Sequence, residues 1–269
     1  MRKIVHMSDL HFGRTDPAVV ERSITFVNEI KPDLVTVSGD LTQRARSWQF
    51  QEARAFLDAL PRPQIIVPGN HDVPLYNIFS RFLRPLDKYQ RYITSDLRPF
   101  YADEEMAVVG VNTARSLTFK GGRINEHQVA RVREKICELS EEIVKVVVSH
   151  HPFDLPEGLP ENELVGRARM AMETLASCGA DLFLAGHLHI SHTGHSSQRY
   201  KIAGHSALVV QAGTATSTRG RGEANSFNVI RLQHPEIAVE RIEWQQESSA
   251  FALASTEQFR HTPDGWMRA

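Results

Sequence analysis

Five short apolar runs in this 269-residue chain each end in a cluster of aspartate, asparagine or histidine. The clearest run covers residues 64–68 and leads directly into Gly69-Asn70-His71-Asp72. An apolar, β-branched run that stops at Pro and Gly is typical of a buried strand. In open α/β sheets, ligands bind beyond the carboxyl ends of the strands. The chain is therefore expected to gather side chains that bind a metal or move a proton at one edge of a sheet.

The apolar runs alternate with amphipathic helical patterns. Strands are expected at residues 3–7, 33–37, 64–68, 106–111, 143–148 and 181–185, and helices near 18–30, 48–60, 125–139 and 165–177. Residues 73–103 show no clean period and are interpreted as helical or irregular cover over the sheet edge. From residue 190 onward, short strand-like runs predict an antiparallel meander that forms or joins a second sheet. This order of elements favours a layered α/β fold.

Composition narrows the class of protein. With 41% hydrophobic and 23% charged residues, the chain is expected to be globular, with one domain over residues 1–245 and a tail over 246–269 that packs on the body or at a homodimer interface. A formal net charge of −1 gives no overall attraction to nucleic acid, so nucleic acid is an unlikely partner. No apolar stretch is long enough to span a membrane, which favours a cytoplasmic location without membrane contact. Cys137 and Cys178 are interpreted as buried thiols rather than as a paired framework.

The strand ends supply a set of candidate metal ligands. They are Asp9, His11, Asp40, Asn70, one of the neighbours His150 and His151, His187 and His189. Because residues two apart in extended backbone point to the same side, Asp9 with His11, and His187 with His189, are each expected to form a two-toothed clamp. Carboxylate, imidazole and amide oxygen together suit Mn, Fe, Co or Zn. Seven ligands are too many for one open four-coordinate site, which indicates two metal ions that share a carboxylate.

Two neighbouring metal ions are the arrangement that activates water for phosphoryl hydrolysis. A water that bridges both ions supplies hydroxide near neutral pH, so the predicted reaction is attack of this hydroxide on phosphorus. Asp40 is the expected bridge because a lone carboxylate in the middle of the set is the best donor to both ions. His71 remains free to act on the substrate, and Asp72 is expected to orient it.

The chain resembles the calcineurin-like metallophosphoesterase superfamily in five blocks, which occur in that family's order over residues 9–189. The blocks are Asp9-x-His11, Gly39-Asp40, Gly69-Asn70-His71-Asp72, His150-x-Pro152 and Gly186-His187-x-His189. The resemblance implies a four-layer αββα sandwich, in which two mixed β-sheets are flanked by helices. It also implies that the site lies at the strand ends.

The resemblance divides the ligands into two sets. It implies that one ion is held by Asp9, His11, Asp40 and His189, and the other by Asp40, Asn70, His150 and His187. His150 is preferred over His151 because the family motif reads His-x-Pro, which leaves His151 behind the ligands or facing the substrate. His71 is implied to contact the phosphoryl group or to protonate the leaving oxygen. Mn and Fe are the expected metals, with Zn and Co as alternatives.

Two weaker segments resemble the class III cyclic nucleotide phosphodiesterases: Asn112-Thr113-Ala114-Arg115 and residues 219–227. Within the second segment, Arg219 and Arg221 are either part of a solvated loop or able to attract an anionic phosphate. The expected substrate contacts are Asn70, His71, His151, Arg219 and Arg221.

The predicted function is hydrolysis of cyclic nucleotides, such as 3′,5′-cyclic AMP, or of other small phosphodiesters. A broad-specificity phosphomonoesterase or phosphodiesterase, or a nuclease of the same superfamily, is the alternative, although a short and nearly neutral chain disfavours the nuclease. A non-catalytic scaffold with the same fold is a further alternative. The scaffold is disfavoured because such proteins usually lose metal ligands, and none is missing here.

Overall fold

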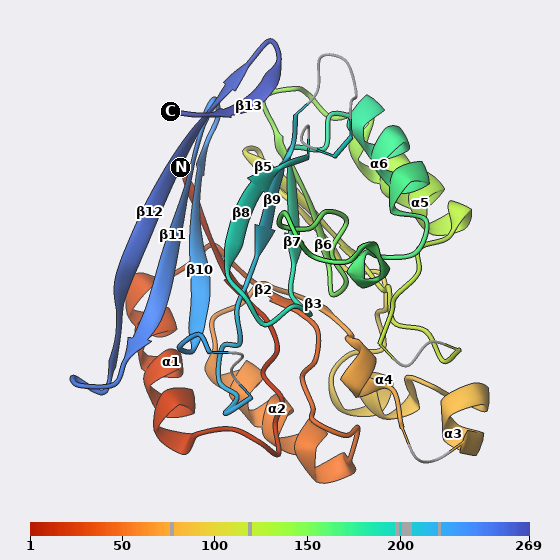
Figure 1. Cartoon of the computed structure of the whole chain (residues 1–269), viewed down its shortest axis with the longest axis vertical. Helices are drawn as coiled ribbons and strands as arrows, with labels where there is room; N and C mark the ends of the chain where they lie inside the picture. The colour runs from red at the N-terminus through yellow and green to blue at the C-terminus, as the bar shows by residue number, and fades with distance from the viewer. Residues whose placement is uncertain (76–77, 118–119, 197–198, 201–205, 220–221) are drawn as a thin grey trace.

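The computed structural model describes residues 1–75, 78–117, 120–196, 199–200, 206–219 and 222–269. Two mixed β-sheets pack face to face, and helices cover the outer face of each sheet (Figure 1). The predicted four-layer αββα sandwich is therefore confirmed.

The first sheet has seven strands in the order β13-β12-β11-β10-β1-β2-β3. Their bounds are β1 (Arg2–Met7), β2 (Leu34–Ser38), β3 (Gln64–Val67), β10 (Ser226–Gln233), β11 (Glu236–Gln245), β12 (Ala250–Thr262) and β13 (Gly265–Arg268). The strands β1, β2 and β3 are parallel, whereas β10 to β13 run antiparallel to their neighbours. Helices α1 (Pro17–Ile30) and α2 (Ser47–Ala59) lie on the outer face of this sheet (Figure 1).

The second sheet has six strands in the order β4-β5-β6-β7-β9-β8. Their bounds are β4 (Phe100–Ala102), β5 (Met106–Val111), β6 (Val144–Ser149), β7 (Leu182–Ala185), β8 (His192–His195) and β9 (Leu208–Gln211). The four inner strands are parallel, and the two edge strands are antiparallel. Helices α5 (Glu126–Ile136) and α6 (Ala168–Ser177) cover its outer face (Figure 1).

Local sequence signals explain where the helices begin. Asp16 caps α1 by accepting a hydrogen bond from the Ala18 amide, and Pro17 occupies the first helical position, where a missing N–H costs nothing. Asn125 caps α5 by accepting from the Gln128 amide, which confirms the predicted cap. The remaining short helices are α3 (Ile78–Leu83), α4 (Asp87–Tyr92), η1 (Asn70–Asp72) and η2 (Glu161–Glu163).

The buried apolar side chains form three clusters, one between each pair of adjacent layers. Alternation along the strands produces this division, because successive side chains face opposite sides of a sheet. On β1, Val5 and Met7 pack toward the helices, whereas Ile4 joins the core between the sheets. The inner parallel strands are therefore apolar on both faces, as their unbroken apolar sequence predicts.

The last third of the chain differs from expectation in two ways. The predicted meander is split, because β9 lies parallel to β7 in the second sheet, whereas β10 and β11 extend the first sheet from β1. Residues 246–269, which were expected to form a tail, instead supply β12 and β13 at the edge of the first sheet. The Trp266 indole donates a hydrogen bond to Asp181 at the start of β7, so this segment packs against both sheets.

The interpretation of the two cysteines as unpaired thiols is wrong. Cys137 and Cys178 form a disulfide bond, although 41 residues separate them in the sequence. Cys137 caps the carboxyl end of α5 and Cys178 caps that of α6, and these helices pack side by side on the second sheet (Figure 1). The pairing depends on this packing, which the spacing of two cysteines does not reveal. Within the described residues, no helix is long and apolar enough to cross a bilayer.

Candidate metal centre

Five loops meet where strands of both sheets end, and they carry all seven candidate metal ligands. The loops follow β1, β2 and β3 of the first sheet and β6 and β7 of the second. Six of the seven ligands are less than a tenth exposed, and Asn70 is half-buried. The convergence expected from the sequence is thus present in the fold.

The first group of ligands consists of Asp9, His11, Asp40 and His189. The Oδ1 atom of Asp9 lies 3.4 Å from Nε2 of His11 and 3.2 Å from Nε2 of His189. The Nε2 atoms of His11 and His189 are 3.3 Å apart. Oδ2 of Asp40 lies 3.8 Å from Nε2 of His11. Oδ1 of Asp9 therefore faces both imidazole Nε2 atoms, and Oδ2 of Asp40 faces that of His11.

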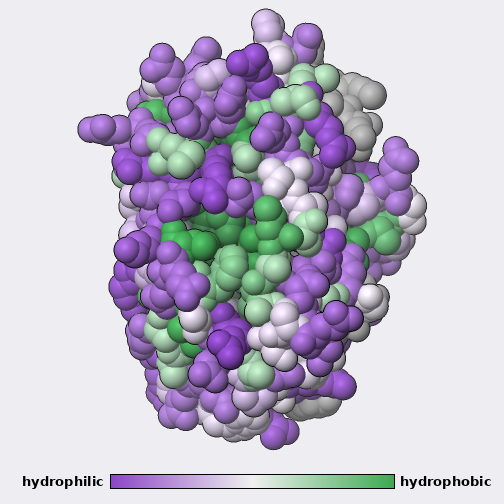
Figure 2. Space-filling view, turned by 90° about the vertical axis from the view of Figure 1, so that its left-hand side faces the viewer, coloured by the Kyte–Doolittle hydropathy of each residue, from purple (hydrophilic) through white to green (hydrophobic). Residues whose placement is uncertain are grey.

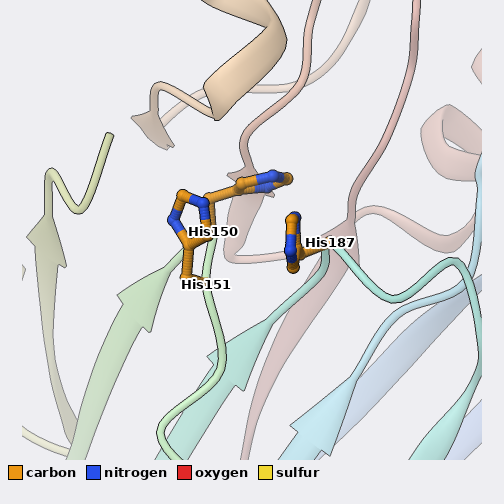
Figure 3. Close-up of side chains that lie close together, drawn as sticks. All are labelled: His150, His151 and His187. Atoms are coloured by element: carbon orange, nitrogen blue, oxygen red, sulfur yellow. The ribbon is translucent and has the colours of Figure 1, made fainter. Parts of the chain in front are cut away.

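The second group forms around His150. Its Nε2 atom lies 3.0 Å from Oδ1 of Asn70 and 3.4 Å from Oδ1 of Asp40. The ring of His187 is 5.1 Å from the ring of His150, centroid to centroid. Figure 3 shows His150, His151 and His187 gathered beyond the ends of β6 and β7. Asp40 directs Oδ2 to the first group and Oδ1 to the second, which is the position expected of a shared ligand.

The protonation pattern of these groups fits bound metal ions. The Nδ1 atom of His150 lies 2.8 Å from the Ser38 carbonyl oxygen and must donate to it, so in the neutral ring Nε2 carries only a lone pair. Without bound ions, burial acts to lower the pKa of His150 but the charge of Asp40 outweighs it and raises this pKa to about 9, so Nε2 carries a proton that a metal ion would displace. Among the described residues, no group donates a hydrogen bond to the buried Oδ1 of Asp9. Buried imidazole and carboxylate groups that converge in this way suit transition metals.

The electrostatics of the shared carboxylate agree with this reading. Burial acts to raise the pKa of Asp40, but the adjacent His150 and His71 together outweigh burial. The pKa of Asp40 is therefore held below its ordinary value, and the group is an anion at neutral pH.

The expectation that extended backbone continues through the ligand motifs is wrong. Asp9, His11, Asp40, His187 and His189 all adopt left-handed backbone, with φ between 49° and 73°. Such strained conformations are uncommon for residues other than glycine and cluster at functional sites. Each clamp is therefore formed by two left-handed turns around one intervening residue and not by the alternation of a strand.

Two glycines allow the loops to approach one another. A Cβ atom on Gly69 would collide with the backbone and side chain of Asp40, and one on Gly186 would collide with Ser8 and Asp9. Asp9 itself joins the loops, since its Oδ2 accepts hydrogen bonds from Ser8 Oγ at 2.7 Å and from the His187 amide at 2.9 Å.

His71 lies beside the first group, with its ring centroid 4.9 Å from that of His11. Its Nδ1 atom donates to the Gln43 carbonyl oxygen at 2.9 Å, which leaves a lone pair on Nε2 in the neutral ring. Arg219 donates from Nη1 to that Nε2 atom at 3.2 Å. The structure thus brings His71 and Arg219 together at the edge of the site. Arg221 lies outside the described residues.

The Asp72 carboxylate binds backbone amides of two loops and does not contact the ring of His71. Its carboxylate accepts hydrogen bonds from the amides of Gly69, Leu41 and Thr42, and it thereby fixes the loops after β2 and β3 relative to each other. Burial, and then the charge of Asp40, raise the pKa of Asp72 to about 7. The expectation that Asp72 orients His71 is corrected, because Gln43 is the partner of the ring.

His151 lies in one cluster with His150 and His187, but its ring contacts other groups of the protein. Its Nδ1 lies 2.8 Å from Thr113 Oγ1, and its Nε2 lies 2.8 Å from the Lys120 carbonyl oxygen. Both ring nitrogens are thus occupied by the protein, and the ring supports the loop after β6 from behind His150. These contacts agree with the alternative in which His151 lies behind the ligands, and its contact with substrate stays a prediction.

Three residues near the centre are absent from the sequence-based set. Gln43 holds His71, Thr214 Oγ1 lies 3.0 Å from Nδ1 of His189, and Glu163 Oε2 lies 3.2 Å from Nε2 of His187. Thr214 follows β9 closely, so the strand-end signal that identified the ligands would also have found it. Gln43 acts through its backbone and Glu163 lies on the loop between β6 and α6, so neither carries a sequence signal.

Comparisons with known proteins agree with this geometry. The model of the calcineurin-like phosphoesterase family matches residues 2–191. A glycerophosphodiester phosphodiesterase, GpdQ from Enterobacter lignolyticus (strain SCF1), is 27% identical over 164 residues, which are 56% of this chain and 58% of that protein. The match therefore spans less than two thirds of that relative.

Solved structures show the same fold at low identity. A dimetal phosphatase from Danio rerio has a TM-score of 0.67 at 14% identity, covering 94% of this chain and 98% of that one. A purple acid phosphatase from yellow lupin (Lupinus luteus) seeds has a TM-score of 0.72 at 13% identity, covering 95% of this chain and 53% of that one. The family match over most of the chain, together with the clustered ligands and the shared fold, shows that this protein belongs to the calcineurin-like phosphoesterase family.

Proposed function

We propose that this protein is a two-metal phosphodiesterase that hydrolyses small phosphodiesters. The observation that carries the proposal is the convergence of the candidate ligands on Asp40, whose two carboxylate oxygens face His11 of one group and His150 of the other. The relative's name, glycerophosphodiester phosphodiesterase, supports the same reaction class.

The proposed ligands of the first ion are Asp9, His11, Asp40 and His189, and those of the second are Asp40, Asn70, His150 and His187. Mn or Fe are the proposed metals, with Zn or Co as alternatives, because nitrogen and oxygen ligands are mixed and no thiolate is present among them. When bound, the ions supply Lewis acidity toward phosphoryl oxygens and lower the pKa of water.

Two side chains are proposed to act on the substrate. Arg219 already approaches the site through His71, and its guanidinium is suited to pair with phosphate oxygens. Binding of a phosphate by Arg219 would release Nε2 of His71, which lies 4.0 Å from Asp40 Oδ2. The freed nitrogen could then contact the phosphoryl group, or take up a proton from solvent and pass it to the leaving oxygen. Asn70 serves both as a ligand and as a contact near the substrate.

The proposed substrates are a narrower class than all phosphoesters. Cyclic nucleotides such as 3′,5′-cyclic AMP are proposed from the segments that resemble class III phosphodiesterases, and glycerophosphodiesters are the second candidate because of the named relative. A nuclease is disfavoured because the net charge of −1 supplies no surplus of positive charge for a polyanion.

The test is a comparison of metal-depleted and Mn-reconstituted protein on bis-p-nitrophenyl phosphate, 3′,5′-cyclic AMP, a glycerophosphodiester and a phosphomonoester. Activity should require Mn, and His71→Ala should lower kcat by about 10²- to 10⁴-fold. His127→Ala, which removes an exposed histidine on α5, is the matched control and should retain full activity. Undiminished turnover in excess chelator would contradict the two-metal proposal, and full activity of His71→Ala would remove that residue from the mechanism.

A homodimer is proposed along the edge of the first sheet. Within the described part of the chain, β13 pairs with β12 only from Phe259 to Thr262, which leaves the outer edge of the preceding half of β12 open. Figure 2, which looks from the side of β12, shows apolar side chains gathered at mid-height, and Leu253 on this strand is 58% exposed. An open strand edge presents unpaired backbone groups and pairs readily with another chain.

Light scattering during size-exclusion chromatography checks the dimer proposal. Wild-type protein should elute as a dimer and Leu253→Lys as a monomer, while a monomeric wild type would contradict the proposal. The cytoplasmic location stays a prediction, and the disulfide weighs against it because disulfides are rare in the reducing cytosol.

A further inference from the structure

Glu163 reaches into the second ligand group from a loop that none of the five sequence blocks includes. It ends η2, in the segment between β6 and α6, and its Oε2 lies 3.2 Å from Nε2 of His187. The His187 side chain is 8% exposed and that of Glu163 is 27% exposed, so the pair is mostly shielded from water. A shielded carboxylate and imidazole at this distance form a stronger hydrogen bond than an exposed pair.

The loop that carries Glu163 is held in place at both ends. Arg199 donates from Nε to Asp154 Oδ1 at 2.7 Å and from Nη1 to Glu161 Oε1 at 3.0 Å. The Tyr200 hydroxyl donates to the Phe153 carbonyl oxygen at 2.6 Å. The segment at 199–200 thus clamps the β6–α6 loop over His187.

The contact with Glu163 determines which ring nitrogen of His187 is available. A carboxylate oxygen accepts hydrogen bonds, so Nε2 of His187 donates to Glu163 and the lone pair of the neutral ring lies on Nδ1. His150 and His189 are also held through one nitrogen, by the Ser38 carbonyl oxygen and the Thr214 hydroxyl. Of these three partners, which are Glu163, the Ser38 carbonyl oxygen and the Thr214 hydroxyl, Glu163 is the charged one.

We propose that Glu163 is the positioning residue of His187, and that it makes binding of the second metal ion depend on the position of the β6–α6 loop. The proposal rests on the two-metal centre proposed above. A carboxylate that accepts from a ligating imidazole fixes its orientation and raises its basicity, and loss of such a partner lowers metal affinity about 10- to 100-fold. The first group meets this loop through Asp40 and His150 and not through the contact of Glu163 with His187, so it should keep its affinity.

The experiment titrates metal-depleted protein with Mn and follows both binding steps by calorimetry and electron paramagnetic resonance. Glu163→Ala should weaken the second step about 10- to 100-fold and leave the first unchanged. Glu163→Gln keeps an oxygen that accepts from Nε2 and should restore most of the affinity. Glu157→Gln, an exposed glutamate of the same loop, is the control and should match wild type.

Each outcome decides between the proposals. Wild-type protein that binds a single Mn ion would overturn the two-metal centre and this inference together. Two ions bound equally tightly by wild type and Glu163→Ala would overturn only the role of Glu163. Equal weakening of both steps in Glu163→Ala would also overturn it, because that result indicates a general loss of structure. Arg199→Ala should weaken the second step in the same direction by releasing the loop.

Discussion

Gly186 precedes His187 and lies directly against Ser8 and Asp9, the residues that join the β1 and β7 loops. Asp9 is completely buried and accepts hydrogen bonds there, so neither side chain has space to move aside. A single methyl group at this position would therefore act directly on a proposed ligand of the first ion.

Gly186→Ala is expected to lower stability by about 1–3 kcal/mol, the usual cost of overpacking, and to weaken binding of the first metal ion. Denaturant unfolding and Mn titration measure the two effects. Gly121→Ala is the matched control, because a Cβ atom there would meet no atom within 4 Å. Wild-type affinity in Gly186→Ala would show that the β1 and β7 loops separate without affecting Asp9.

Asp181 makes stability depend on pH at a distance from the metal centre. Its carboxylate accepts hydrogen bonds from the Lys145 amide and the Trp266 indole, both at 2.8 Å. Burial raises its pKa from 3.8 to about 6 despite these bonds. The folded protein therefore keeps a proton between about pH 4 and 6 that the unfolded chain has released, and this group's contribution to stability falls as pH rises through that window.

Asp181→Asn should remove this dependence. Across pH 4 to 7, the unfolding free energy of the variant is expected to rise relative to wild type by up to about 3 kcal/mol, the equivalent of two pKa units. Urea unfolding at a series of pH values measures the difference, in which the other titrating groups cancel. A constant difference would mean that Asp181 titrates normally in the folded protein.

The residue types at the metal centre were predictable, but their conformations and partners were not. Aspartate and histidine at strand ends identify the ligands because few other side chains bind metals. The left-handed backbone of His187 and the contact of Gln43 with His71 arise from loop geometry, which depends on the packing of both sheets.

The disulfide bond links the carboxyl ends of two helices, α5 and α6. It closes a loop of 41 residues that contains β6 and the loop carrying Glu163. Closing a loop of this length restricts the unfolded chain and stabilises the fold by about 4 kcal/mol in the chain-entropy model. The helices α5 and α6 would remain packed without it, because their apolar faces are buried in the third cluster.

Reduction, or the double variant Cys137→Ser with Cys178→Ser, should lower the unfolding free energy by about 2–4 kcal/mol while leaving Mn binding unchanged. Thermal unfolding with and without reductant measures the loss. Thiol alkylation of unreduced, denatured protein, followed by mass spectrometry, provides the control. Two alkylated cysteines in that control would show that the bond does not form.

Strand β12 was not predicted from the sequence because its pairing with β11 is irregular. Arg241 pairs with Ser255 and Ile242 pairs with Leu253, so Ala254 is an extra residue that forms a bulge. A bulge interrupts the two-residue alternation on which strand prediction depends. Small and polar residues on an open edge add no apolar period to replace it.

At the scale of the whole molecule, the proposed ligands come from both sheets, and Asp40 of the first sheet faces His150 of the second. Bound metal should therefore stabilise the packing of the two sheets as well as the loops. The family and the four layers were predictable from the order of blocks and elements. The assignment of β9 to the second sheet and β10 to the first was not, because pairing between distant strands leaves no local pattern.

Saturation with Mn at 100 times its dissociation constant should raise the unfolding free energy by about 2.7 kcal/mol per ion. Calorimetry of metal-depleted and Mn-loaded protein measures the rise in the unfolding midpoint. Asp40→Asn is expected to reduce it, because both groups lose their shared carboxylate. An unchanged midpoint in wild-type protein at saturating Mn would contradict binding between the sheets.

The split origin of the ligands also sets an order of events during biosynthesis. Asp9 leaves the ribosome 180 residues before His189, and both belong to the same ligand group. A nascent chain carries Asp9, His11 and Asp40 but lacks the fourth ligand of this group until the residues after β7 have been made. Metal acquisition must therefore be a late step of maturation, and a truncated translation product would be unable to complete the centre.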